Sequence, residues 1–179
     1  MSRDSTIDQV ATVVCAALAR HGIRAALSGG AVVSIYSRNA YESDDLDFIV
    51  QGFARKVDPA MEEIGFRREA GRRYWTHPDT HYWVEFPQGP LRVGDEVVDE
   101  VAELRSALGV LRLLPPTECV MDRLAAYYHW NDAQGLEQAV LVASRHPVHM
   151  ARIEQWSRRE GAEGRFRDFV DQLESARSG

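Results

Sequence analysis

The first part of the chain switches between the two periodicities that distinguish helices from strands. In residues 5–22, apolar side chains recur every three or four positions behind a cap at Ser5 or Thr6, which predicts an amphipathic helix. A short apolar run then predicts a strand over residues 23–29. Two glycines follow it and begin a predicted helix over residues 30–38.

The middle of the chain is richer in strand patterns. Runs of alternating or continuous apolar residues predict strands over residues 44–50 and 81–87. Between them we expect a short helix over residues 59–65 and a hairpin over residues 66–77. A connection rich in glycine and proline leads to a last hairpin over residues 101–114.

The pattern changes at Pro116, after which helical spacing dominates. Prolines and glycines divide this part into four predicted helices, over residues 116–132, 135–146, 147–161 and 164–175. The fold class expected from the whole pattern is α+β. A mixed β-sheet with flanking helices occupies residues 1–114, and a C-terminal α-helical part occupies residues 115–179.

The composition indicates a compact globular protein and argues against several other classes. The 179 residues are 45% hydrophobic and 27% charged, which suits one compact domain or a domain with a helical appendage. The net charge of -6 argues against general nucleic-acid binding, so any such contact has to be local. Cys15 and Cys119 form neither a disulfide framework nor a zinc-ligand set. The polar N-terminus and the lack of a long apolar run predict a cytoplasmic protein with no membrane partner.

Two aspartates stand in the strand predicted over residues 44–50. Because side chains two apart in a strand share a face, Asp45 and Asp47 point the same way while Leu46 and Phe48 pack behind them. Carboxylates held together repel unless a cation lies between them, and Mg²⁺ prefers oxygen ligands. The alternative is an acidic loop that runs into a strand, with both aspartates solvated.

Two further features favour the metal site. Ser28, Gly29 and Gly30 lie between a strand and a helix, where backbone N–H groups and the helix N-terminus favour an anion such as a triphosphate. The turn lacks the lysine of a P-loop and the spacing of a dinucleotide fingerprint. Glu85 lies within an apolar strand, so it either faces water or shares a cation with the aspartates.

The Gly29-Gly30 turn, the helix after it, the Ser43-x-Asp45-x-Asp47 pattern and a later strand acid resemble the polymerase-β-type nucleotidyltransferase superfamily. The resemblance is to its small bacterial group of AbiEii-like toxins and MNT-type proteins. It covers about a third of the chain. It implies that Ser28, Gly29 and Gly30 bind the phosphates of a nucleoside triphosphate (NTP), and that Asp45, Asp47 and Glu85 are catalytic metal ligands.

The implied activity moves a nucleoside monophosphate from an NTP to a hydroxyl of an RNA, a protein or a small molecule. The implied activity requires Mg²⁺ or Mn²⁺, and members of the family bind two such ions. The resemblance also implies a toxin–antitoxin system, in which the protein has a cognate partner. The family's lysine in the helical part has no counterpart here. The alternative function is a catalytically weak or inactive module with this fold that acts by nucleotide or partner binding.

Other candidates have two interpretations each. Arg38 follows the helix that begins at Gly30, and it is either a phosphate ligand or a solvated helix end. The segment over residues 66–77 is either a nucleic-acid platform or an exposed basic hairpin with its aromatic rings turned to the core. That segment contains Arg67, Arg68, Arg72 and Arg73 beside Phe66, Tyr74 and Trp75.

The remaining candidates are histidines and helical side chains. The pairs His77 with His81 and His146 with His149 have metal-like spacing but no third ligand in sequence, which disfavours zinc. Three aromatic residues are expected in the core or a cleft wall rather than in a base-stacking platform, namely Tyr127, Tyr128 and Trp130. Three charged residues are expected to pair on the surface rather than to line the cleft, namely Asp122, Arg123 and Asp132.

Overall fold

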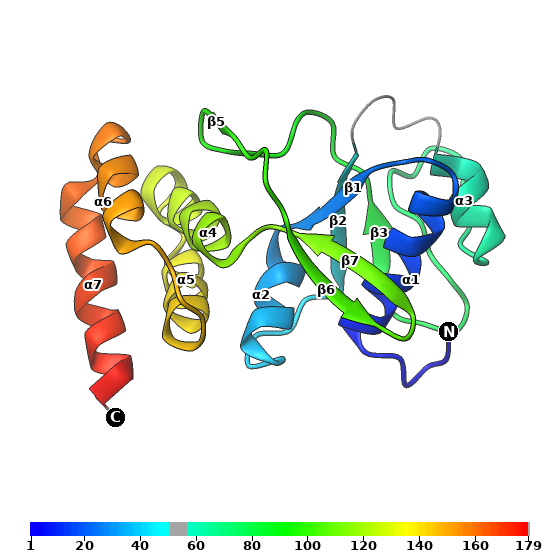
Figure 1. Ribbon diagram of the computed structural model, residues 1–179, viewed down its shortest axis with the longest axis horizontal. Helices are drawn as coiled ribbons and strands as arrows, with labels where there is room; N and C mark the ends of the chain where they lie inside the picture. The colour runs from blue at the N-terminus through cyan, green and yellow to red at the C-terminus, as the bar shows by residue number, and fades with distance from the viewer. Residues whose placement is uncertain (51–56, 179) are drawn as a thin grey trace.

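The computed structural model of the protein describes residues 1–50 and 57–178. It shows a mixed β-sheet with flanking helices, followed by helices that stack beyond one end of the sheet (Figure 1). This arrangement confirms the predicted α+β class. Below, residues 1–114 are called the α/β half and residues 115–178 the helical half.

The sheet has five strands in the order β3-β2-β1-β7-β6. The central strand β1 pairs antiparallel with β2 and parallel with β7, while β2 pairs parallel with β3 and β7 pairs antiparallel with β6. Strands β3 and β6 therefore form the two edges. The bounds are β1 Ala25–Ser28, β2 Asp45–Val50, β3 Trp83–Glu85, β6 Ala102–Ser106 and β7 Gly109–Leu113.

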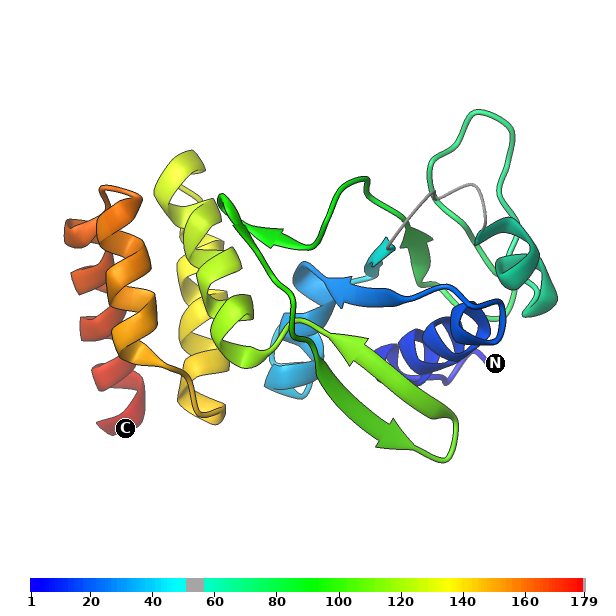
Figure 2. The same cartoon turned by 45° about the horizontal axis from the view of Figure 1, so that its top comes forward.

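Three helices belong to the α/β half. Helix α1 (Ile7–Arg20) begins where the Gln9 side chain accepts a 3.1 Å hydrogen bond from the Thr6 backbone N–H, and its apolar stripe packs on β1 and β7. Helix α2 (Gly30–Ser37) follows β1 directly and contacts both α1 and β1. Helix α3 (Asp58–Glu63) packs against α1. Figure 2 shows α1 and α2 together below β1.

Strand β2 separates the core from the candidate site. Its burial alternates residue by residue, so that Leu46, Phe48 and Val50 lie in the core while Asp45 and Asp47 are half-buried on the other face. The predicted division between an apolar and an acidic face is therefore present. The alternation fixes the register of β2, because a slip of one residue would bury both carboxylates.

The helical half consists of α4 (Pro116–Trp130), α5 (Ala133–Arg145), α6 (Met150–Arg159) and α7 (Glu163–Ser178). Helix α2 lies between the sheet and these helices (Figure 1). The carbonyls of Tyr36 and Ser37, which have no partner within α2, accept hydrogen bonds from His146 (2.9 Å) and Arg145 (2.6 Å). These bonds join the two halves.

Two segments differ from the sequence prediction. The connection before residue 101 contains a small hairpin of β4 (Arg92–Val93) and β5 (Glu96–Val97), which turns at Gly94 with φ 55°. Conversely, the hairpin predicted over residues 66–77 is reduced to a single antiparallel bridge between Arg67 and Thr76. The described residues include no helix that is long and apolar enough to cross a membrane.

Candidate active site

Strand pairing brings the three predicted carboxylates together. In the parallel pair of β2 and β3, Asp45 lies opposite Trp83 and Asp47 lies opposite Glu85. Paired residues of adjacent strands project from the same face of the sheet, so Glu85 shares the acidic face of β2. Asp45, Asp47 and Glu85 therefore form one patch of like charge.

The electrostatics of the patch reflect this crowding. Burial, followed by the charges of Asp45 and Glu85, raises the pKa of Asp47 from 3.8 to about 6. Burial and the charge of Glu85 also raise the pKa of Asp45, an effect that the Trp83 side chain partly opposes. The ionised form of both aspartates is thus held in a place that disfavours it.

The patch also contains an acceptor atom without a donor. Asp45 Oδ1 is buried and has no hydrogen-bond partner among the residues that the structure describes. A buried acceptor is normally paired, and leaving one unpaired costs about 1–3 kcal/mol. Ionised carboxylate oxygens are the ligands that a hard divalent cation prefers, so these residue types fit Mg²⁺ or Mn²⁺.

The three carboxylates share one face of the sheet, but their side chains are not positioned to bind one metal ion together. Within residues 1–50 and 57–178, no three His, Cys, Asp or Glu side chains are already gathered as metal ligands.

The glycine turn lies directly beside the aspartates. Ser28 pairs with Asp47 across β1 and β2, and Gly29 follows with φ 71° and ψ -155°, a conformation that is essentially restricted to glycine. A Cβ atom on Gly29 would lie 2.9 Å from Asp47 Oδ2. Only glycine therefore allows the backbone to pass this close to the carboxylate.

Two hydroxyl groups border the N-terminus of α2. A Cβ atom on Gly30 would lie 3.3 Å from both Ser43 Oγ and Tyr41 Oη. Ser43 is held in place because its hydroxyl accepts from the Asp45 backbone N–H (3.3 Å) and donates to the Asp45 carbonyl (3.2 Å). Tyr41 carries no sequence signal of its own. The turn thus offers backbone N–H groups and hydroxyls beside the acidic patch.

Helix α4 places a charged pair toward the same patch, which corrects the expectation that Asp122 and Arg123 pair on the surface. Their side chains are only 22% and 19% exposed, and Arg123 Nε donates to Asp122 Oδ2 at 3.0 Å. The Arg123 charge lowers the pKa of Asp47, and the Asp122 charge raises it. Both residues are near the site because α4 packs beside α2.

Two other predicted residues lie away from the patch. Asp132 is exposed and caps α5, accepting from the Gln134 backbone N–H at 3.0 Å. Arg38 follows the last residue of α2, so it is about 12 Å along the helix axis from the glycine turn. Its backbone has φ 54°, and its side chain is exposed. We therefore leave Arg38 out of the proposed site.

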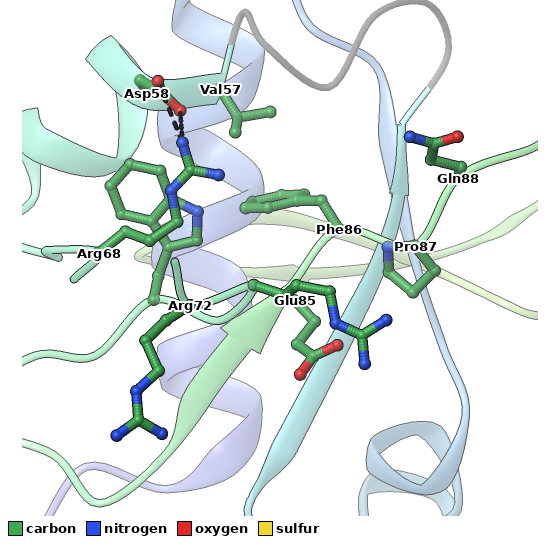
Figure 3. A pocket seen from close by; sticks show the side chains of 10 residues that line it. Val57, Asp58, Arg68, Arg72, Glu85, Phe86, Pro87 and Gln88 are labelled. Carbon is green, nitrogen blue, oxygen red and sulfur yellow. Dashed lines mark hydrogen bonds and ion pairs between the residues drawn. The ribbon is translucent and has the colours of Figure 1, made fainter. Parts of the chain in front are cut away.

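The basic segment over residues 66–77 borders a hollow beside Glu85. Phe66 and Trp75 are buried in the core, and the Arg68 guanidinium lies 5.0 Å from the centre of the Trp75 ring. Figure 3 shows the side chains around the hollow. The volume of the hollow is about 700 Å³. Its lining consists of Val57, Asp58, Arg68, Arg72, Arg73, Trp75, Glu85, Phe86, Pro87 and Gln88.

The predicted histidine pairs take part in local contacts. His146 binds the Tyr36 carbonyl, as described above, and its ring lies 4.7 Å from the Tyr36 ring. His77 Nδ1 accepts from the Asp79 backbone N–H at 3.0 Å, and His81 lies 3.4 Å from Asp44.

The aromatic residues of α4 separate into two groups. Tyr128 is buried, stacks on Trp156 and hydrogen-bonds to Ser157 at 2.8 Å, as expected for the core. Trp130 is 75% exposed, which contradicts the expectation of a core or cleft position. It is the last residue of α4 and lies three residues after Tyr127, on the more solvated side of the helix.

Comparisons with known proteins place the fold. A comparison with protein-family models and with curated protein sequences gives no match. Among solved structures, the chain is similar to an antigenic nucleotidyltransferase-like protein from Paracoccidioides brasiliensis. The TM-score is 0.59 and the identity 12%, over 79% of this chain and 77% of that chain.

A second similar structure is the solution structure of the antibiotic-resistance factor ANT(2'')-Ia, which reveals substrate-regulated conformation dynamics. The TM-score is 0.50 and the identity 15%, over 95% of both chains, so the likeness includes the helical half. At these identities the comparisons show a shared fold, which is nucleotidyltransferase-like.

Proposed function

We propose that the protein is a nucleotidyltransferase dependent on Mg²⁺ or Mn²⁺, which moves a nucleoside monophosphate from an NTP to an acceptor hydroxyl. The observation that carries the proposal is the patch of Asp45, Asp47 and Glu85 beside a glycine turn that no other residue type could form. The nucleotidyltransferase-like fold supports the proposal. The acceptor is an RNA, a protein or a small molecule.

Each residue has a part that follows from its position. Asp45, Asp47 and Glu85 would hold the cation, which supplies charge neutralisation at the reacting phosphate and lowers the pKa of the attacking hydroxyl. The N–H groups at the start of α2 bind NTP phosphates, and the Ser43 and Tyr41 hydroxyls border the same place. Arg123 adds positive potential from the helical half.

In the transfer, the acceptor oxygen forms a bond to the α-phosphorus of the NTP. The bond from that phosphorus to the bridging oxygen breaks, and pyrophosphate leaves with the electron pair. Glu85 takes the hydroxyl proton, because it is the carboxylate on the edge strand and opens on the hollow described above. The sheet contributes by fixing the positions of the groups before the reaction.

The alternative is a module that binds a nucleotide or a partner protein without transfer. It is favoured by the unfinished arrangement of the carboxylates. The toxin–antitoxin role, the cognate partner and the cytoplasmic location stay predictions from the sequence.

The test is a transfer assay with the purified protein. Each labelled NTP is supplied with Mg²⁺ or Mn²⁺, and with total RNA, protein or small-molecule extract as the acceptor. Separate calorimetry measures binding of Mg²⁺ with NTP. We expect Asp45→Asn and Asp47→Asn to lose both activities and to stay folded, because each removes a repelling charge. Asp44→Asn, one residue earlier and exposed, is the matched control.

The outcomes separate the two candidate functions. Binding of NTP with Mg²⁺ but no transfer to any acceptor would favour the binding module. Unchanged metal and nucleotide affinity in both Asp45→Asn and Asp47→Asn would contradict the site itself. If these variants unfold while Asp44→Asn does not, the aspartates are structural.

A further inference from the structure

The hollow beside Glu85 contains both a carboxylate of the acidic patch and a cluster of arginines. Arg68, Arg72 and Arg73 line it, against two carboxylates, Asp58 and Glu85. Figure 3 shows Arg68 turned to Asp58, with Arg72 below Arg68 and Glu85 near the middle of the view. Its volume of about 700 Å³ is within the range of small-molecule sites.

The arginines of the hollow outnumber its carboxylates, and its two carboxylates already have other interactions. The Asp58 carboxylate is already 3.5 Å from Arg68, and Glu85 belongs to the acidic patch. Arg72 contacts Glu69 at 3.5 Å, and both side chains are more than half exposed, so that pair is weak. Arg73 is exposed and forms no hydrogen bond or ion pair with any residue that the structure describes. Arg72 also donates to Tyr74 Oη. An anion in the hollow would therefore bind Arg73 directly, and it would bind Arg72 in exchange for these exposed partners.

The hollow and the glycine turn lie on opposite sides of Asp47. Ser28 pairs with Asp47 from β1, and Glu85 pairs with it from β3. Adjacent strands are about 4.8 Å apart, so the two anion-binding regions are separated by about two strand spacings with the carboxylates between them. This is the arrangement that a two-substrate transfer needs, with the NTP on one side and the acceptor on the other.

The aromatic residues do not make the hollow a stacking platform. Trp75 is buried with Arg68 over its ring, and the Arg72 guanidinium covers the Tyr74 ring at 5.3 Å. Recognition in the hollow therefore depends on charge and on hydrogen bonds from guanidinium groups. Arginine binds phosphate through paired N–H donors, so a phosphate ester is the anion that this lining suits.

We propose that the hollow beside Glu85 binds the acceptor, and that the acceptor is a hydroxyl compound carrying a phosphate group, which Arg72 and Arg73 hold. This inference rests on the proposed function, because it assigns the second substrate of that transfer. Phosphate with a free hydroxyl occurs at the 3′ end of an RNA strand and in a small phosphorylated sugar. Both sources offer the same chemistry to the hollow.

The test measures binding rather than turnover. Two probes carry the chemistry, a fluorescent single-stranded RNA pentamer with a free 3′ hydroxyl, and ribose 5-phosphate, with ribose as the uncharged control. The full chain is compared with the double variant Arg72→Gln/Arg73→Gln. The matched control is Arg105→Gln/Arg158→Gln, which removes two arginines of similar exposure, 74% and 63%, far from the hollow. A non-hydrolysable NTP analogue with Mg²⁺ is titrated into each protein separately.

We expect the Arg72→Gln/Arg73→Gln variant to bind a phosphate probe at least about tenfold more weakly, because two charge-assisted hydrogen bonds are lost. The control variant should stay within about twofold of the wild type, and all three proteins should bind the NTP analogue equally. If the source is RNA, the slope of log affinity against log salt should fall by about 1.4 in the variant. If it is a small molecule, ribose 5-phosphate should bind as well as the pentamer.

Three outcomes would overturn the inference. Equal losses of probe affinity in both double variants would show a general effect of surface charge. Unchanged probe affinity in both would show that Arg72 and Arg73 do not bind the probe. Displacement of the probe by the NTP analogue, one for one, would make the hollow part of the NTP site. Arg72→Lys/Arg73→Lys should restore part of the affinity, which checks that the glutamine variant acts through charge rather than through folding.

The design also keeps this inference separate from the proposed function. A wild-type protein that binds no NTP analogue with Mg²⁺ would contradict the proposed function, and the acceptor assignment would fall with it. Normal NTP binding without arginine-dependent binding of either probe would overturn only the acceptor assignment.

Discussion

The two halves of the protein treat their buried charges in opposite ways. In the helical half, Glu118 is 9% exposed and pairs with Arg152, and Arg165 donates to the Tyr128 carbonyl at 2.7 Å. In the α/β half, Asp45, Asp47 and Glu85 share one face of the sheet, and all three carry a negative charge. The helical half thus pairs its buried charges with groups of opposite sign. Among the described residues, the positive charge that acts on Asp47 is that of Arg123, which is itself paired with Asp122.

Each half also contains one buried polar atom without a partner among the described residues, but the free-energy costs of the two atoms differ. Trp156 Nε1 in the helical half and Asp45 Oδ1 in the α/β half are both buried without a partner among the described residues. A neutral indole N–H without a partner costs far less than an ionised carboxylate in the same situation. Strain of this size, confined to one face of one strand pair, is typical of a binding site rather than of a scaffold.

The largest expected effect comes from Glu85→Gln. This change keeps the shape of the side chain but removes a charge and the proton acceptor, while Asp45 and Asp47 can still hold a cation with NTP. We expect transfer to fall by at least about 10³-fold with NTP affinity within about threefold of wild type. Single-turnover assays with labelled NTP and calorimetry measure the two quantities.

The control for Glu85→Gln is Glu103→Gln on the opposite edge strand, β6, where the side chain pairs with Arg105 and Arg112. It should change neither quantity. Parallel loss of binding and transfer in Glu85→Gln would mean that Glu85 belongs to nucleotide binding, and the division of labour among the three acids would be wrong.

Arg152→Ala tests the helical half, where removing a charge should have the opposite effect on stability. The Glu118 carboxylate would then be buried without a partner, and we expect the free energy of unfolding to fall by about 2 kcal/mol. The value is below that of a fully buried pair because Arg152 is 44% exposed and also contacts Glu96 at 3.6 Å. Urea denaturation measures the change.

The matched control on the same helix is Arg158→Ala. Its partner Glu154 is exposed, so the loss should stay below about 0.5 kcal/mol. Equal losses for Arg152→Ala and Arg158→Ala would show that Glu118 is solvated in solution, and the contrast between the halves would disappear.

The sequence was sufficient for the parts of the site that depend on local pattern. Alternation in residues 44–50 predicts the acidic face of β2, and the two glycines predict the start of α2. The approach of Glu85 to Asp47 depends on the register of β2 against β3, which the sequence indicates only through the chemical need for a third acid. That expectation agrees with the strand pairing.

Other parts of the site depend on tertiary packing, which leaves no local signal. Arg123 and Asp122 are ordinary charged residues of a helix, and their charges act on Asp47 only because α4 docks beside α2. Tyr41 borders the glycine turn because the chain folds back after α2. The β4–β5 hairpin had a signal in the Gly94-Asp95 turn, but strands of two residues are too short to show alternation.

The smallest expected effect is a dependence of stability on pH that belongs to the acidic patch. Since the pKa of Asp47 is raised to about 6 in the folded protein, from 3.8, the folded state binds a proton that the unfolded state releases between about pH 4 and pH 6. Stability of the metal-free protein should therefore fall as the pH rises through this window and level off above it. Allowing for solvent screening of a half-buried group, we expect a loss of about 1–2 kcal/mol.

Urea denaturation of wild type and Asp47→Asn at pH 4 to 7.5 measures this loss, and the difference between the two proteins removes the titration of distant groups. The charge of Asp45 acts on Asp47, so the difference reports the aspartate pair rather than one carboxyl alone. Saturating Mg²⁺ should cancel the decline, because a bound cation favours the ionised form, and Mg²⁺ affinity should rise with pH up to about 6. Identical pH profiles for the two proteins, with and without Mg²⁺, would show that Asp47 is already relieved by solvent or by Arg123. The acidic patch would then be no more strained than the paired charges of the helical half.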